Sequence, residues 1–116
     1  MRPLSIVFGI SLLVLILIGS IPSIAHQLSV FAWVEGNSVL VEACLPKGKH
    51  PKLGDVLVYD GEDQLLLKTR LLPDGTSSFP LENWETGFRI VVDIGHGHRA
   101  YWILTPYDIQ QQRDGQ

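Results

Sequence analysis

Histidine is the residue of this chain best suited to hold a transition-metal ion, and His26 stands where it could supply two ligands. Ser23 and Ala25 form the small-x-small pattern that signal peptidase accepts. Cleavage after Ala25 would free the amine of His26, and that amine can close a chelate on one ion together with a ring nitrogen. The junction therefore predicts a chelating N-terminus.

Two further histidines stand in the sequence Gly95-His96-Gly97-His98. In a regular strand, residues two apart point to the same face, and in a turn the flexible glycines let both side chains adjust their direction. Nickel(II) and copper(II) favour tetragonal sets of nitrogen and oxygen donors, and imidazole suits both ions. We therefore expect a metal site made of His26, His96 and His98. Such a site requires the start of the first strand to lie near the tip of the last hairpin.

Three other residues that could bind a metal have a simpler interpretation. His50 stands in a loop with a proline on either side and is expected to be a solvated surface residue. Cys44 is the only cysteine of the chain, which excludes an internal disulfide and a zinc site with paired cysteines. We expect it to be a small, buried residue of a strand. Asp93 is either a solvent-facing strand residue or a partner that holds an imidazole of the hairpin.

The segment before His26 has the plan of a secretory signal. Arg2 gives an early positive charge, and residues 6–18 form a nearly unbroken apolar run. We interpret residues 1–25 as a signal peptide. The alternative is a retained membrane anchor, because the apolar stretch approaches the ~20 residues that span a bilayer. Both interpretations export residues 26–116, either to the periplasm or to the outer side of a membrane that anchors them.

The composition limits the function classes. Residues 26–116 carry eight Lys and Arg against twelve Asp and Glu, which disfavours binding to the phosphate backbone of a nucleic acid. The sequence lacks a nucleophile elbow, a paired-glycine phosphate loop and a histidine-glutamate helix motif. We therefore expect no enzyme, no organic cofactor and no small organic substrate. An oxidase whose copper ion is held by an N-terminal histidine is the catalytic alternative.

The elements that must position these residues are strands. Apolar residues recur with period two in short runs that Gly, Pro, Asn and Asp separate. We predict an all-β domain over residues 26–105, a single antiparallel β-sandwich of immunoglobulin-like or transthyretin-like type, after an N-terminal hydrophobic export helix. The polar residues 106–116 lack periodicity and are expected to form a disordered tail. The seven expected strands are Leu28–Val34, Ser38–Leu45, Asp55–Asp60, Gln64–Arg70, Ser77–Leu81, Phe88–Ile94 and Arg99–Leu104.

Two parts of the chain resemble a known group of proteins. The segment from His26 to Gly36 (HQLSVFAWVEG) and the block from Gly95 to Trp102 (GHGHRAYW) resemble the extracytoplasmic auxiliary proteins of cobalt and nickel transporters of the energy-coupling-factor class. The middle of the chain, with VYDG at Val58–Gly61 and DGTSSF at Asp74–Phe79, resembles the carboxypeptidase regulatory-like β-sandwich. The second resemblance concerns the fold and not an activity.

The first resemblance implies a non-enzymatic accessory of metal uptake. Such a protein binds nickel or cobalt as cargo outside the cytoplasm and presents it to the subunits of a membrane transporter. The resemblance includes His26 and also supports His98, which stands in the Gly-His-Arg-Ala block. Nickel and cobalt come from the resemblance alone, because copper outcompetes nickel at nitrogen-rich sites. The alternative is an interaction module that docks a membrane protein without a metal and whose histidines are incidental.

Overall fold

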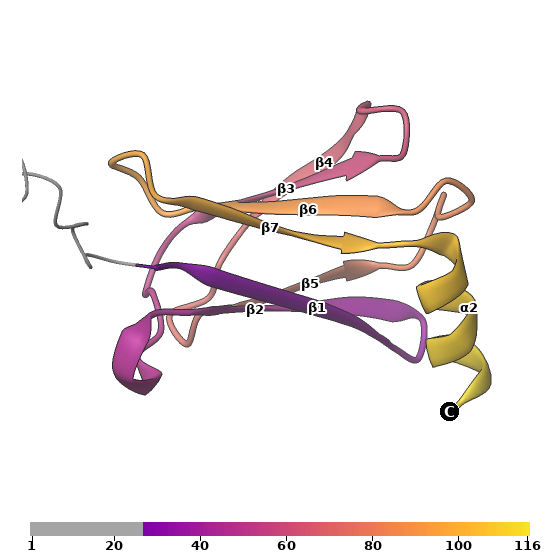
Figure 1. Cartoon of the computed structure of the whole chain (residues 1–116), viewed down its shortest axis with the longest axis horizontal. Coiled ribbons are helices and arrows are strands. Elements are labelled where there is room, and N and C mark those ends of the chain that lie inside the picture. Colours follow the sequence, from indigo (N-terminus) through magenta and orange to yellow (C-terminus); the bar gives the residue numbers. More distant parts are fainter. Residues whose placement is uncertain (1–26) are drawn as a thin grey trace, which may run out of the picture.

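The computed structural model describes residues 27–116, which form seven strands in two antiparallel sheets. His26 and the expected export helix lie outside the described residues. The three-stranded sheet has the order β1-β2-β5, and the four-stranded sheet has the order β4-β3-β6-β7. Figure 1 shows them as two layers. The strands are β1 (Ser29–Glu35), β2 (Ser38–Cys44), β3 (Asp55–Asp60), β4 (Leu65–Arg70), β5 (Thr76–Pro80), β6 (Phe88–Asp93) and β7 (Arg99–Leu104).

The expectation of a mostly β protein with about seven strands is confirmed, and each strand lies close to its predicted position. The alternation of buried and half-exposed residues along β2 is the period-two pattern that places one face of a strand against a core. A 3-10 turn, η1 (Pro46–Gly48), follows β2, and one α-helix, α2 (Pro106–Asp114), follows β7. Within residues 27–116, no helix has the length and apolar character needed to cross a membrane.

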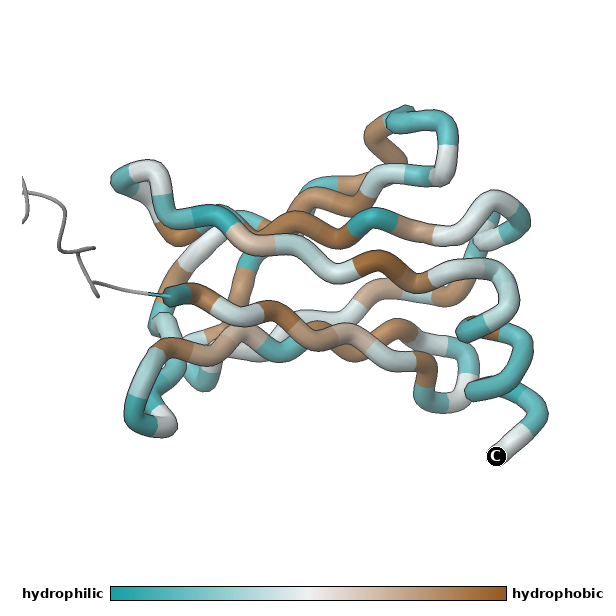
Figure 2. The backbone as a smooth tube through the Cα atoms, in the orientation of Figure 1, coloured by the Kyte–Doolittle hydropathy of each residue, from teal (hydrophilic) through white to brown (hydrophobic). Residues whose placement is uncertain are grey.

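The two sheets share one hydrophobic core. Apolar positions along the backbone concentrate in the strands, while the turns between them are mostly polar (Figure 2). The rings of Phe79 in β5 and Phe88 in β6 meet edge to face, with 5.4 Å between their centroids, and so join the two sheets. The fully buried side chains come from both sheets and from α2, and the largest are Val39, Val41, Val56, Val58, Ile90, Val92, Leu104 and Ile109.

Strands β1 and β7 are edges of different sheets that lie next to each other. They run in the same direction in Figure 1, from the end where the described chain begins toward α2. The ring of Phe31 in β1 contacts that of Trp102 in β7, with 5.6 Å between the centroids. This contact fixes the relative position of the two strands along their length.

The expectation of a disordered tail over residues 106–116 is wrong, because residues 106–114 form α2. Thr105 accepts a hydrogen bond from the amide of Asp108, and the Asp108 carboxylate accepts one from the amide of Thr105, which makes a complete capping box. Pro106 is pre-organised for the first helical turn. Ile109, the apolar residue of this polar segment, is fully buried in the core. A cap and one buried side chain thus order a segment whose composition resembles that of disordered chains.

Two glutamines of the C-terminal segment bind the free edge of β1. Gln112 accepts a hydrogen bond from the amide of Val34 (2.7 Å), and the Gln116 side-chain amide donates one to the carbonyl of Val34 (2.6 Å). Gln116 also accepts a hydrogen bond from the amide of Gly36. These side chains form hydrogen bonds with backbone groups of β1 that face away from its partner strand β2.

Candidate functional site

One end of the molecule gathers every histidine of residues 27–116. The register pairs Ser29 with Cys44, and it pairs Asp55 with both Arg70 and Asp93. The start of β1, the loop 45–54, the turn 71–75 and the turn 94–98 therefore lie at the same end, at the left of Figure 1. We call these four segments the histidine end. His50 lies in the loop 45–54, and His96 and His98 lie in the turn 94–98.

The turn that carries His96 and His98 is closed by its own hydrogen bonds. The amide of Ile94 donates to the carbonyl of His98, and the amide of His98 donates to the carbonyl of Gly95, both at 3.0 Å. His96 has a left-handed backbone (φ 55°) between two glycines that also have positive φ. His96 is exposed at the tip, and His98 is half-buried where the turn meets β7.

Asp93 anchors this turn. Its carboxylate accepts a hydrogen bond from the amide of Gly95 (2.9 Å) and forms an ion pair with Arg99 (3.1 Å). Asp93 is half-buried at the end of β6, directly opposite Arg99 at the start of β7. Its observed contacts therefore hold the hairpin in shape, which fixes where the two histidines leave the sheet.

The start of β1 lies at the same end of the molecule as this turn. Phe31 contacts Trp102, and Gln27 and His98 each precede these residues by four positions in strands that run in the same direction. Gln27 is the neighbour of His26 in the sequence. The predicted site requires the start of β1 to lie near the last hairpin. The two segments lie at the same end of the molecule. The position of His26 itself lies outside the described residues.

A different group of ligands comes together on β2. In residues 27–116, Glu42, Cys44 and His50 are the only three His, Cys, Asp or Glu side chains that cluster as metal ligands would, with ligand atoms within 4.8 Å of one another. His96 and His98 belong to no such group of three among these residues. The Cys44 thiol donates a long hydrogen bond to the Glu42 carboxylate (3.7 Å) and lies 4.0 Å from Nδ1 of His50.

The local sequence explains the cluster. Glu42 and Cys44 are two apart in β2, so they share the outer face of the sheet while Ala43 between them is buried. The loop then reverses the chain, with a left-handed Lys47 and a hydrogen bond from the amide of Leu45 to the carbonyl of Lys49 (2.8 Å). This reversal returns His50 to the end of β2.

The turn 71–75 supports His50 from the other side. Gly75 has φ +81°, and a Cβ atom at this position would lie 2.9 Å from Cβ of His50 and 3.0 Å from the carbonyl oxygen of Ala43. Glycine is therefore required where the turn packs against this loop. The neighbouring Asp74 has its pKa lowered, chiefly by hydrogen bonds from Thr76 and to a smaller extent by the charge of His50.

The electrostatics of the cluster keep the thiol protonated in the absence of a metal. Burial raises the pKa of Cys44 above its ordinary value, and the charge of Glu42 and its hydrogen bond with the thiol raise it further. Cys44 is therefore a poor nucleophile by itself. A divalent cation would reverse this preference, because it stabilises the thiolate and the carboxylate together.

The cluster corrects the expectation for two residues. His50 is exposed, as predicted, but its ring contacts Cys44 and the backbone of β2. Cys44 is half-buried on the outer face of the strand and not in the core. The signal in the sequence was the spacing Glu-x-Cys within a strand, followed by a histidine after a short loop bounded by prolines. The closeness of His50 to β2 depends on the loop geometry, which the spacing alone does not determine.

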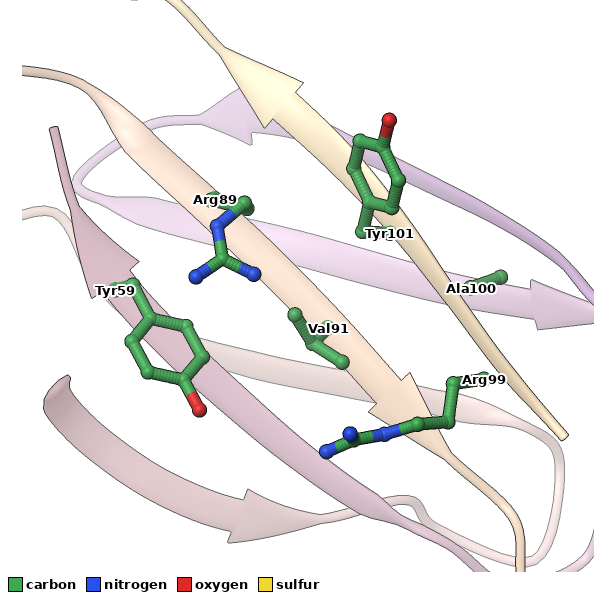
Figure 3. Close-up of a pocket in the computed structure, with 6 residues that line it drawn as sticks. All are labelled: Tyr59, Arg89, Val91, Arg99, Ala100 and Tyr101. Carbon is green, nitrogen blue, oxygen red and sulfur yellow. The ribbon is translucent and has the colours of Figure 1, made fainter. Parts of the chain in front are cut away.

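A second surface lies on the outer face of the four-stranded sheet. It holds a shallow pocket of about 410 Å³ lined by residues of β3, β6 and β7. Figure 3 shows Arg89 beside Tyr59, and Val91 between Arg89 and Arg99. The guanidinium of Arg89 lies 4.4 Å from the centre of the Tyr59 ring, which is a cation–π contact. Tyr101 (62% exposed) and Ile103 (52% exposed) extend the same face along β7.

Comparisons of the chain with models of protein families, with curated proteins and with solved structures found no match in any of the three.

Proposed function

We propose that this protein is an extracytoplasmic accessory of transition-metal uptake, which binds nickel(II) or cobalt(II) through His26, His96 and His98 and presents the ion to a membrane transporter. The observation that carries the proposal is the histidine end. His96 and His98 emerge there from one turn, at the end of the molecule where the strand that follows His26 begins. The resemblance described above points to the same cargo and to the same class of partner.

The scaffold of this accessory is a β-sandwich of immunoglobulin-like or transthyretin-like type, similar to the carboxypeptidase regulatory-like fold. The two sheets and their common core support this assignment. A sandwich leaves its loops at two ends, as in other proteins that bind ligands through loops on a rigid scaffold. One end carries the histidines, and α2 packs near the other (Figure 1).

The proposed site suits delivery and not catalysis. His96 is exposed, and the glycines on both sides of it let the ring adjust as an ion arrives or leaves. An ion held by a few imidazoles at the surface exchanges readily, which a protein that hands over its cargo requires. The partner is a set of membrane transporter subunits, and the protein acts outside the cytoplasm, either free in the periplasm or attached through residues 1–25.

Titration calorimetry with nickel and cobalt tests the metal claim. The exported protein is purified, its N-terminus is sequenced to establish whether the amine of His26 is free, and wild type is compared with His26→Ala, His98→Ala and the double variant. We expect each single change to weaken nickel binding and the double change to abolish this site. Gln110→Ala, an exposed change on α2, is the control and should bind as wild type does. Unchanged nickel binding in the double variant would contradict the proposal.

The second candidate is an interaction module that docks a membrane protein without a metal. The observation that favours it is the exposed aromatic and cationic face around Tyr101 and Arg99, since aromatic residues and arginine are enriched at protein interfaces. Co-purification with transporter subunits separates the two functions. Loss of the complex in Tyr101→Ser, with retention in a variant that lacks His26, His96 and His98, would favour the interaction module. The opposite result would favour the metal accessory.

A further inference from the structure

We propose that Glu42, Cys44 and His50 form a second metal site, which binds a zinc(II)-class ion through one sulfur, one nitrogen and one oxygen ligand. The site neither includes His26, His96 or His98 nor depends on them. It therefore goes beyond the function proposed above and can be tested separately from it.

The ligand set selects the class of ion. Thiolate, imidazole and carboxylate are the three ligand types of protein zinc sites, with bonds of about 2.3 Å to sulfur and about 2.0–2.2 Å to nitrogen and oxygen. Three protein ligands leave the fourth position of a tetrahedral ion open to water. Cobalt(II) accepts the same geometry and serves as a probe. The thiolate favours zinc, whereas the nitrogen-rich site at His26, His96 and His98 suits nickel or copper.

The separations in the cluster are close to those that an ion requires. Tetrahedral bonds of these lengths hold ligand atoms about 3.3–3.8 Å apart. The ligand atoms of Glu42, Cys44 and His50 lie within 4.8 Å of one another. The ligands must therefore approach by up to about 1.5 Å. Small rotations of an exposed imidazole and of a carboxylate at the sheet surface supply this movement.

The backbone prepares the imidazole for an ion. Nδ1 of His50 lies 3.0 Å from the carbonyl oxygen of Ala43. A carbonyl only accepts hydrogen bonds, so this contact requires a proton on Nδ1, and in the neutral ring the lone pair is then on Nε2. A ligating histidine commonly donates its other ring N–H to a backbone carbonyl in this way. The Ala43 carbonyl thus orients the ring through Nδ1, so that Nε2 is the nitrogen that would bind an ion.

The charges around the cluster also favour a cation. Glu42 contributes one negative charge, Cys44 contributes a second when its thiol is deprotonated, and Asp74 lies close enough to His50 to interact with it electrostatically. Binding is a balanced exchange in which the metal–sulfur bond replaces the sulfur–hydrogen bond and the proton leaves to water. No oxidant or reductant takes part.

The test is a cobalt(II) titration of the full chain in a mild detergent, monitored by absorption spectroscopy. We expect a thiolate-to-cobalt charge-transfer band in the near ultraviolet, which zinc(II) removes by displacing the cobalt. Cys44→Ser should abolish the band. Loss of a residue that only supports a metal ligand weakens metal binding by about 10–100-fold at known sites. His50→Ala and Glu42→Gln remove ligands themselves, so each should weaken cobalt binding by at least this factor. Lys49→Ala, a change in the same loop, should leave the titration unchanged.

The two proposed metal sites can be tested independently of each other. In the double variant His26→Ala/His98→Ala, the charge-transfer band should persist. The heat of nickel binding at the site of His26, His96 and His98 should be lost in the same variant. Circular dichroism confirms that each variant keeps its sheet content, and Cys44→Ser preserves size at a half-exposed position. Absence of the band in folded wild type would overturn the proposal. A band that survives in folded Cys44→Ser, or unchanged affinity in folded His50→Ala, would overturn it as well.

Discussion

Shortening Ile109 to alanine tests whether α2 belongs to the core. Ile109 is fully buried, although it lies in a helix of nine residues that is otherwise polar. It contacts the cluster of strand side chains that both sheets share. If α2 is anchored by this one side chain, Ile109→Ala should destabilise the whole protein and not only release the helix.

The size of the effect follows from the burial. Ile109→Ala removes three buried carbon groups at about 0.8 kcal/mol each, or about 2.4 kcal/mol before any cavity is counted. Buried isoleucines changed to alanine lose about 2–5 kcal/mol. We expect about 3 kcal/mol, because a helix near the end of the chain can move in to fill part of the space. A domain of this size has about 5–13 kcal/mol of stability in total, so the loss is a large fraction of it.

Urea unfolding followed by tryptophan fluorescence measures this loss, and a thermal scan should show a midpoint lower by about 12–24 °C. Tyr107→Ala provides the control, because Tyr107 lies on the same helix and is 71% exposed. It should change the stability by less than about 0.5 kcal/mol. Equal effects of the two substitutions would refute the reasoning, since they would show that α2 contributes its helix and not a core side chain.

Three further changes probe the cap, the packing behind His50 and the thiol. Thr105→Ala removes the capping box and should cost about 1 kcal/mol in urea unfolding, whereas no loss would mean that the packing of Ile109 alone holds the helix. Gly75→Ala forces a Cβ to 2.9 Å from Cβ of His50 at φ +81° and should cost at least about 2 kcal/mol; a neutral result would show that the turn relaxes freely. The midpoint of the alkylation rate of Cys44 against pH should lie above that of the same thiol in the urea-unfolded protein, and Glu42→Gln should lower the folded midpoint. Because the folded pKa of Cys44 is raised, the stability that the thiol contributes is present below its unfolded pKa and is lost as the pH rises through the folded pKa; a folded midpoint at or below the unfolded one would contradict the assignment.

The strands were predictable because their signal is local. Alternation in Ser38–Cys44 and the turn residues around Gly61 and Gly95 report the face and the end of a strand within a few positions. A single buried face also fixes the register, since a shift by one residue would turn every apolar side chain outward. The mostly β fold with seven strands therefore followed from the sequence.

The helix α2 and the cluster on β2 were not predictable, because both depend on contacts between distant segments. A single apolar residue such as Ile109 gives no helical periodicity. Its burial requires a gap in the core, and the strands that form this gap are distant in the sequence. The polar composition of the same segment predicts disorder, although the side-chain amides of its glutamines pair with β1. For His50, the residue types are visible in the sequence, but the loop geometry and the packing of Gly75 decide that its ring returns to Cys44.

The glutamine contacts on β1 have a consequence for the order of events during synthesis. Gln112 follows Val34 by 78 positions, so the outward edge of β1 near Val34 stays unprotected while most of the chain is still being made. An open strand edge is a template for pairing with another chain. Slow synthesis would therefore favour association through β1, and this risk ends only when the C-terminal segment has been made and its glutamine side chains occupy the edge.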